Sequence, residues 1–241
     1  MILAHPAFLR DVKGLLFDKD GTLFDFQASW AGWARQVLAE ICAGDPGLEA
    51  RLAQAMRFDS LNARFLPDSP VIAGTGDEIA DLLAPHLPHW PGGTAALAGW
   101  LGERAAQAPM VPAVPLSPLL SRLGSAGFRL GVATNDYEYV AREHLIAEIA
   151  LFDFIAGADS GHGAKPEPGM LLAFAAQTGL APRQVLMVGD SQHDLLAGRA
   201  AGMRTLAVLT GVAGAEELSP YADLVCPDIG HLPGLLGLPQ D

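Results

Sequence analysis

The sequence predicts an α/β fold, a doubly wound parallel sheet with a separate α-helical domain inserted into it. Two features carry this prediction. Short apolar runs that end in polar residues alternate with segments of helical character, as parallel strands alternate with their connecting helices. Between the first and second of these runs lie about a hundred residues, far more than an ordinary crossover connection needs.

The predicted strands are the apolar runs. The first covers Lys13 to Phe17 and ends at Asp18, and the second covers Phe128 to Thr134 and ends at Asn135. Apolar runs without polar alternation are typical of strands that are buried on both faces of a parallel sheet. Three further runs complete the predicted sheet: residues 154–156, 185–188 and 205–209.

The predicted core helices follow these strands and cover residues 137–149, 168–178 and 191–201. Gly179 and Gly202 come directly after the last two, and glycine is the residue that most often ends a helix.

The long interval between the first two strands predicts a helical insert. It contains three start signals for helices: Asp45 with Pro46, Thr75 with Glu78, and Gly93 with Thr94. It shows no strand alternation, so we interpret the insert as helical. Prolines from Pro109 to Pro115 mark the return to the sheet. We therefore assign residues 1–25 and 109–241 to the α/β core and residues 26–108 to the helical domain.

Composition excludes several classes of protein. Half of the 241 residues are hydrophobic, so the chain folds, yet no run approaches the roughly 20 apolar residues that cross a bilayer. The formal charge of -12 disfavours nucleic acids and anionic membranes as partners. Two cysteines and the lack of an export signal at the start predict a cytoplasmic protein. A small phosphorylated metabolite remains a suitable partner, and both a monomer and a homodimer remain open.

Asp18 and Asp20 stand at the end of the first strand, followed by Gly21. An Asp-Gly pair alone would indicate only a turn. Here the glycine also lets the backbone approach a phosphate, with loop amides directed at its oxygens. Two neighbouring carboxylates repel each other when both are ionised, so a divalent cation or a shared proton is expected.

Further polar groups are expected at the same edge of the sheet. Thr134 and Asn135 end the second strand, although such residues commonly end strands without any catalytic role. Lys165 precedes a proline just before a helix. Because the chain has only three lysines and uses arginine elsewhere, Lys165 is a candidate for a role that needs a compact ammonium group.

Asp190 and Asp194 follow the fourth strand. Asp190 could merely cap the next helix, and Asp194 could be an acidic first-turn residue that favours the helix dipole. Together with Asp18 and Asp20, however, they predict an oxygen-rich site that suits Mg²⁺. Zinc is disfavoured because no cluster of histidine and cysteine accompanies them.

These four elements, in this order, resemble the four motifs of the haloacid dehalogenase superfamily. The segment from Asp18 to Thr22 is similar to the D-x-D-G-T signature, and Thr134, Lys165 and the pair Asp190 and Asp194 match the other three motifs. The segment 165–168 and the Gly-Asp-Ser segment at 189–191 resemble the phosphoglycolate phosphatase-like branch, whose helical cap lies between the first two motifs. The resemblance implies a Rossmann-like core with such a cap.

The resemblance also implies roles for these residues. Asp18 would be the nucleophile of a Mg²⁺-dependent phosphatase, forming an aspartyl-phosphate, and Asp20 its general acid and base. Thr134 and Lys165 would assist catalysis at the phosphoryl group, and Gly21 and Asn135 would help to bind it. The expected metal ligands are Asp18, the Asp20 carbonyl and Asp190, with Asp194 as a further ligand or as the residue that orients a bound water.

Two alternatives remain open. A hexose-phosphate mutase of the same superfamily shares all four motifs, but its cap usually supplies a histidine and a lysine soon after the first motif, and residues 26–35 contain neither. A non-catalytic phosphate-binding protein could keep the same fold.

Substrate selectivity is expected to come from the inserted domain. Arg57 and Arg64 are seven residues apart and would share a face of a continuous helix. They could be solvated surface residues, or one of them could hold a substrate carboxylate, as in phosphoglycolate, with its planar fork.

Overall fold

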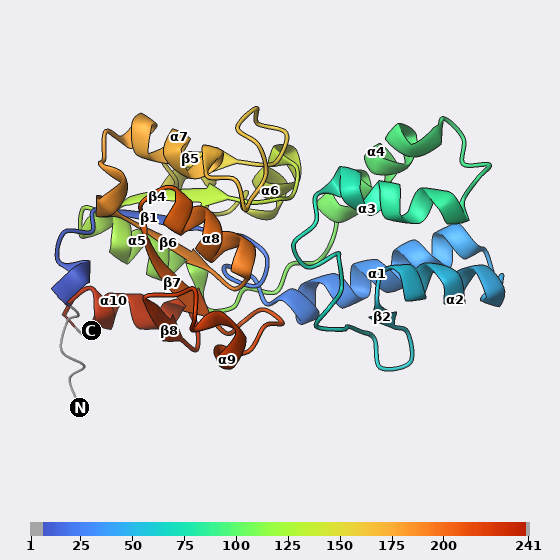
Figure 1. The fold of residues 1–241 in the computed structure, drawn as a ribbon, viewed down its shortest axis with the longest axis horizontal. Coiled ribbons are helices and arrows are strands. Elements are labelled where there is room, and N and C mark those ends of the chain that lie inside the picture. Colours follow the sequence, from blue (N-terminus) through green and yellow to red (C-terminus); the bar gives the residue numbers. More distant parts are fainter. Residues whose placement is uncertain (1–6, 240–241) are drawn as a thin grey trace.

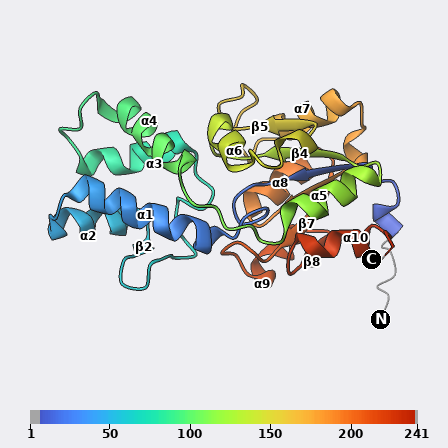
Figure 2. The same cartoon turned by 180° about the vertical axis from the view of Figure 1, so that it is seen from behind.

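The computed structural model describes residues 7–239, which form two lobes (Figures 1 and 2). Residues 1–6 and 240–241, assigned above to the core, lie outside the described residues. Two neighbouring segments of chain connect the lobes: Asp25 N donates to Val111 O at 2.9 Å, and Ala113 N donates to Leu23 O at 2.9 Å. No helix within residues 7–239 has the length and apolarity that crossing a membrane demands.

The larger lobe is built on a six-stranded parallel sheet of order β5-β4-β1-β6-β7-β8. Its strands are β1 (Gly14–Phe17), β4 (Arg129–Ala133), β5 (Phe154–Ala156), β6 (Val185–Gly189), β7 (Arg204–Val208) and β8 (Leu224–Cys226). From β1 the chain first winds outward through β4 and β5 and then returns to wind outward through β6, β7 and β8. The predicted doubly wound parallel sheet is therefore confirmed.

Helices cover both faces of the sheet because successive strand residues point to opposite sides. Leu15 and Phe17 of β1 pack with α5 (Leu116–Ser125) and α10 (Leu232–Leu235), whereas Leu16 packs with α7 (Gly169–Thr178) and α8 (Gln192–Ala200). The remaining helices of this lobe are α6 (Glu138–His144) and α9 (Ala215–Leu218). A sheet that is buried on both faces explains why its strands read as continuous apolar runs.

The register of the central strands sets the position of the polar residues. Phe17, the last residue of β1, pairs with Val132 of β4 and Val188 of β6. The residues that follow these strands therefore come together at the carboxyl edge of the sheet. The boundary between β1 and β6 is also the point at which the winding reverses, where open α/β sheets bind their ligands.

The smaller lobe consists mainly of four helices around a second apolar cluster, to which Val140 of α6 in the larger lobe also belongs. These helices are α1 (Phe26–Cys42), α2 (Pro46–Ala55), α3 (Gly76–Leu83) and α4 (Gly93–Ala106). Two of the predicted helix starts are confirmed. Asp45 accepts hydrogen bonds from the amides of Gly47 and Leu48 at the start of α2, and Thr75 forms a capping box with Glu78 at the start of α3.

One expectation for this lobe is wrong, because it contains strands as well as helices. After α2, the chain forms a short antiparallel hairpin of β2 (Phe58–Asp59) and β3 (Arg64–Phe65). Asp59 Oδ1 accepts from the amides of Leu61 and Asn62 at 3.1 and 3.0 Å, which stabilises the turn. Arg57 and Arg64 therefore do not share a face of a helix.

The predicted helix from Tyr137 to Ile149 is also too long. Helix α6 ends at His144, and the chain then bends so that the side chain of Leu145 is fully buried in the core of the larger lobe. The helices predicted over 168–178 and 191–201 are confirmed to within one residue, and Gly179 and Gly202 have the left-handed conformation expected after a helix.

Candidate active site

Asp18 lies directly after β1 at the carboxyl edge of the sheet, where it is 7% exposed. Its backbone amide donates to Val188 O at 2.8 Å, which ties the loop to the end of β6. Lys165 Nζ donates to Asp18 Oδ1 at 2.5 Å. The other oxygen, Oδ2, receives no hydrogen bond from the residues that the structure describes, so one oxygen is held and the other is available.

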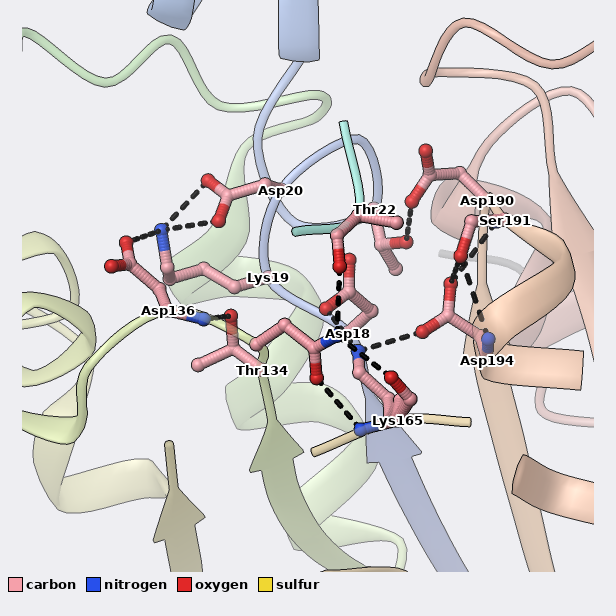
Figure 3. A network of polar contacts seen from close by, with 12 residues as sticks. Asp18, Lys19, Asp20, Thr22, Thr134, Asp136, Lys165, Asp190, Ser191 and Asp194 are labelled. Carbon is pink, nitrogen blue, oxygen red and sulfur yellow. Dashed lines mark hydrogen bonds and ion pairs between the residues drawn. The ribbon is translucent and has the colours of Figure 1, made fainter. Parts of the chain in front are cut away.

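Lys165 joins two of the predicted motifs. Besides Asp18, its ammonium contacts Asp194 Oδ1 at 2.6 Å (Figure 3). Burial alone would lower the pKa of Lys165, but the negative charges of Asp18 and Asp194 outweigh it and raise the pKa. Lys165 is therefore a fixed positive charge within the site.

Asp194 has a second, structural contact. Its Oδ2 accepts from the amide of Ser191 at 3.0 Å and from the Ser191 hydroxyl at 2.7 Å. Ser191 in turn is the N-cap of α8, so Asp194 completes a capping box. The alternative weighed for Asp194, an acidic residue in the first turn of the helix, is confirmed, and the same carboxylate also faces Lys165.

Asp190 is enclosed by small residues. A Cβ atom at Gly21 would lie 2.2 Å from Asp190 Oδ2, and one at Gly211 would lie 1.8 Å from the same oxygen. Gly21 also has a φ of +83°, which side chains rarely adopt. Thr22 Oγ1 donates to Asp190 Oδ1 at 3.2 Å. Asp190 is not the helix cap, a position that Ser191 fills.

Asp18, Asp190 and Asp194 form a buried cluster in which one oxygen of each residue lies within 4.8 Å of the others. Burial raises the pKa of Asp18 to about 7, and the charges of Asp194 and Asp20 act in the same direction. Burial likewise raises the pKa of Asp190 well above its ordinary value. Three carboxylates that face a single ammonium leave a net charge of about -2 when all are ionised. This donor set fits a hard divalent cation.

Thr134 and Asn135 follow β4, beside Asp18. The amide of Asp136 donates to Thr134 Oγ1 at 3.1 Å, so the hydroxyl keeps its own proton to donate. Asn135 fixes the loop of Lys165, because its Oδ1 accepts from Lys165 N at 2.8 Å and its Nδ2 donates to Lys165 O at 2.9 Å. Asn135 Nδ2 also donates to Ala73 O of the smaller lobe at 2.8 Å. Asn135 thus connects the loop of Lys165 to the smaller lobe.

Asp20 is turned toward a second lysine. Lys19 Nζ lies 2.7 Å from each oxygen of the Asp20 carboxylate, and Trp30 Nε1 of α1 donates to Asp20 Oδ1 at 2.8 Å. Lys19 is fully buried. Burial alone would lower the pKa of Lys19, but the charges of Asp20 and Asp136 raise it. Figure 3 shows Lys19 between Asp20 and Asp136 in the same way as Lys165 lies between Asp18 and Asp194.

Two further groups contact Lys19. Asp136 Oδ2 lies 3.4 Å from Lys19 Nζ, so the two groups form an ion pair but no hydrogen bond. Burial raises the pKa of Asp136 to about 6. His144 Nδ1 lies 3.1 Å from Lys19 Nζ, and its Nε2 lies 2.8 Å from Ala105 O in α4. Burial and the charge of Lys19 lower the pKa of His144 to about 4. His144 is therefore neutral, with Nδ1 as acceptor and Nε2 as donor.

A cavity that is partly open to solvent lies between the two lobes. Asp18, Asp20, Thr134, Lys165, Asp190 and Asp194 all line it, so the structure brings together the residues predicted for catalysis and for the metal. Asn135 lines it as well. Trp30, Trp33 and His193 are further lining residues.

Comparison with protein families shows which family has this arrangement of residues. A model of the haloacid dehalogenase-like hydrolases matches residues 12–202, which is most of the chain. The chain belongs to this family. The match includes all four predicted motifs and the whole of the smaller lobe, so the resemblance drawn from the motifs is confirmed.

Individual relatives agree with this membership. The chain is 35% identical over 124 residues to the phosphoglycolate phosphatase of Escherichia coli strain K12, a match that covers 50% of this chain and 49% of that protein. It is 34% identical over 104 residues to the pyrophosphatase PpaX of Bacillus velezensis, covering 42% and 48%. The chain thus spans about half the length of these curated relatives. The two relatives carry different substrate names.

The fold is shared with solved structures. A predicted phosphoglycolate phosphatase from Haemophilus somnus superimposes with a TM-score of 0.69 at 20% identity, and the match covers 92% of this chain and 96% of that one. At this level of identity the likeness concerns the fold, including both lobes.

The structure does not bring Arg57 and Arg64 to the cavity of this haloacid dehalogenase-like protein. Arg57 Nε donates to Asp68 Oδ2 at 2.9 Å, and Arg64 Nε lies 3.8 Å from Asp59 Oδ2. Their side chains are 46% and 62% exposed, and neither lines the cavity. Both arginines are therefore solvated surface residues, which was one of the two alternatives considered, because the hairpin carries them outward.

Sequence reasoning missed the group around Lys19. Lys19 was only the variable position between two aspartates, and His144 lies 125 residues away, so no spacing in the chain signals their contact. The one available signal was the scarcity of lysine, which pointed to Lys165 and applied equally to Lys19.

Proposed function

We propose that this protein is a Mg²⁺-dependent phosphatase that hydrolyses the phosphate monoester of a small molecule through an aspartyl-phosphate at Asp18. The observation that carries this proposal is the buried cluster of Asp18, Asp190 and Asp194 around Lys165. Family membership and the phosphatase relatives support the reaction type.

Asp18, Asp190 and Asp194, together with the backbone carbonyl of Asp20, are the residues that would hold Mg²⁺. Carboxylate and carbonyl oxygens are the ligands that this ion prefers, and no other group of three metal-binding side chains occurs within residues 7–239. When bound, the ion would neutralise charge on the phosphoryl oxygens and lower the cost of bringing a phosphate dianion to a carboxylate.

The free oxygen of Asp18 is the nucleophile in the proposed reaction. It attacks phosphorus, the bond from phosphorus to the substrate oxygen breaks, and Asp20 gives its proton to the departing alcohol. In the second half, Asp20 takes a proton from water as the water oxygen attacks phosphorus, which releases inorganic phosphate and restores Asp18.

Lys165 and Thr134 act on the phosphoryl group. Lys165 holds Asp18 Oδ1, so that Oδ2 faces the incoming phosphorus, and its charge offsets the negative charge that develops there. Thr134 is 1% exposed, and its hydroxyl can donate to a phosphoryl oxygen. Gly21 is not among the residues that line the cavity: its missing side chain makes room for the Asp190 carboxylate, and its amide donates to Phe24 O at 2.7 Å.

We also propose that the smaller lobe, residues 26–108, is a cap that excludes water from the reaction. Its α1 supplies Trp30, which donates to Asp20, and its residue Ala73 accepts from Asn135 of the core. Opening of the cavity would break both contacts. Cys42 and Cys226 are free and buried, which supports a reducing compartment such as the cytoplasm.

The mutase alternative receives no support from the cavity. A phosphorylated sugar would need cationic or multiple polar groups on the cap side, and among the described residues of that side the cavity lining offers no lysine, arginine or histidine.

The test is turnover of p-nitrophenyl phosphate by the purified chain with Mg²⁺, with EDTA, and after Asp18→Asn. We expect activity only in the first case, with a loss of several orders of magnitude in kcat for Asp18→Asn and a folded variant by circular dichroism. Full activity in EDTA would refute the metal requirement. Failure of the folded, Mg²⁺-loaded protein on a broad panel of phosphate esters would favour a phosphate-binding protein.

A further inference from the structure

The two sides of the cavity differ sharply in chemistry. The core side carries the carboxylates, Lys165 and Thr134. The side formed by the smaller lobe carries glycine, alanine and large apolar residues; the most extensive of these are Phe26, Trp30, Trp33, Ile72, Ile79 and Leu101. Because the phosphoryl group lies at the core side, the alcohol part of a substrate faces the apolar side.

Few polar side-chain atoms interrupt this apolar side. They are the indole nitrogens of Trp30 and Trp33, whose rings pack edge to face at 5.4 Å. Trp30 Nε1 is already engaged with Asp20. Trp33 Nε1 is buried and has no hydrogen-bond partner among the described residues. The lobe thus offers a substrate at most one indole donor and an otherwise apolar surface.

The positive charges of the smaller lobe lie elsewhere. Of its five arginines, four are exposed, and Arg104 pairs with Glu40 at 2.7 Å and stacks on Trp100. Neither these arginines nor the lobe's two histidines line the cavity. On the core side, Asp136 also lines the cavity, and its carboxylate is paired with Lys19 at 3.4 Å.

These features determine which leaving groups fit. Against the apolar side, a carboxylate or a second phosphate on the alcohol would lose its water without gaining a lysine, arginine or histidine of the smaller lobe as a partner, and burial of an unpaired charge is strongly unfavourable. The lining histidine, His193, is an exposed residue of the core side. An apolar alcohol would instead gain from leaving water. Its ring could also pack against the two indoles.

We propose that the substrate is a phosphate monoester of an uncharged, largely apolar alcohol with a ring or branched chain, and not a small acid such as phosphoglycolate. This inference rests on the proposed phosphatase activity and assigns its substrate class. It replaces the carboxylate-binding role considered for Arg57 and Arg64, which lie outside the cavity.

The first experiment compares benzyl phosphate, ethyl phosphate and 2-phosphoglycolate with the full chain and Mg²⁺. All three release a primary alcohol, so differences in leaving-group reactivity are small and the comparison reports the fit of the alcohol. We expect kcat/KM for benzyl phosphate to exceed that for 2-phosphoglycolate by about tenfold or more, with ethyl phosphate between them.

A pair of variants locates the effect. Ile72→Ala removes part of the cavity lining, and Ile41→Ala removes the same atoms from a partly buried isoleucine of the same lobe that lies outside the cavity. We expect Ile72→Ala to raise KM for benzyl phosphate by about five- to tenfold and to leave 2-phosphoglycolate unchanged. Ile41→Ala should change neither.

The outcomes separate the two proposals. If 2-phosphoglycolate is hydrolysed as well as or better than benzyl phosphate, the substrate class is wrong while the phosphatase activity stands. If Ile72→Ala affects both esters alike, or if Ile41→Ala has the same effect as Ile72→Ala, the apolar side does not contact the alcohol. If none of the esters is hydrolysed by folded, Mg²⁺-loaded protein, the proposed function fails and the inference fails with it.

Discussion

Replacement of Lys165 by methionine tests the electrostatic account of the site, because Lys165 is the one cation within residues 7–239 that contacts the aspartate cluster. Its side chain is 3% exposed and makes two ion pairs, at 2.5 Å to Asp18 and 2.6 Å to Asp194. Methionine fills a similar volume without the charge. Removal of one partner from a buried ion pair costs about 3–5 kcal/mol, so we expect the free energy of unfolding in EDTA at pH 7.5 to fall by about that amount.

Mg²⁺ and pH should each modify this loss. In the variant, three carboxylates face one another without a cation, so Mg²⁺ should stabilise it more than it stabilises the wild type. The loss should also shrink as pH falls. Burial raises the pKa of Asp18 to about 7, from an ordinary value of 3.8, so protonation below pH 7 favours the folded state, and removal of Lys165 strengthens this effect.

The assay is urea unfolding followed by circular dichroism, with and without Mg²⁺, at pH 5.5 and 7.5. Lys13→Met is the matched control, because Lys13 is an exposed lysine, and its replacement should change the stability by no more than about 0.5 kcal/mol. A loss below about 1 kcal/mol for Lys165→Met in EDTA, or equal stabilisation of variant and wild type by Mg²⁺, would refute the reasoning.

Two other substitutions test neighbouring parts of the site. The pKa of His144 in the folded protein is about 4, below its ordinary value of 6.5. The favourable effect of neutral His144 on the free energy of unfolding is therefore fully present above pH 6.5, and about 3 kcal/mol is lost as the pH falls toward 4. The stability difference between wild type and His144→Gln should therefore change by about that amount between pH 7 and 4; a constant difference in urea titrations would contradict the assignment. Gly21→Ala should weaken Mg²⁺ binding by about tenfold or more in calorimetry, because the new Cβ meets Asp190. Gly44→Ala, which has a similar φ of +90° but open space around it, should leave Mg²⁺ affinity unchanged, and an equal effect of both would assign the loss to backbone strain.

The core of the site could be predicted because local patterns encode it. Asp18, Thr134 and Asp190 each follow an apolar run, and parallel strands bring their carboxyl ends to one edge of a sheet. Parallel strands alone predict that these residues share one edge, whereas the strand order that puts β4 and β6 on either side of β1 comes from the structure. Lys165 was found by a different signal, the scarcity of lysine.

The smaller lobe was less predictable because packing decides it. Arg57 and Arg64 fit a helical spacing, but Asp59 forms a turn through its side chain and the segment pairs as a hairpin. The apolar residues of this lobe have the same spacing whether they face its core or the cavity. Only the folded structure shows that Ile72 lines the cavity and Ile41 does not.

The contacts of Lys19 escaped prediction for a related reason. His144 and Asp136 come from α6 and from the loop before it, and Trp30 comes from the other lobe. Their meeting at one ammonium group depends on how α6 and α1 pack, which no local pattern specifies.

The central claim is that phosphate passes through a covalent bond to Asp18, and the most direct test is to find that bond. In Asp20→Asn, attack on p-nitrophenyl phosphate remains possible because its leaving group needs little protonation, whereas the attack of water slows for lack of a base. Mass spectrometry of acid-quenched, protease-digested protein should then show a phosphate on the peptide that contains Asp18, sensitive to hydroxylamine and more abundant than in the wild type. Phosphate on another residue, or steady release of p-nitrophenol without any phosphorylated peptide, would contradict the account.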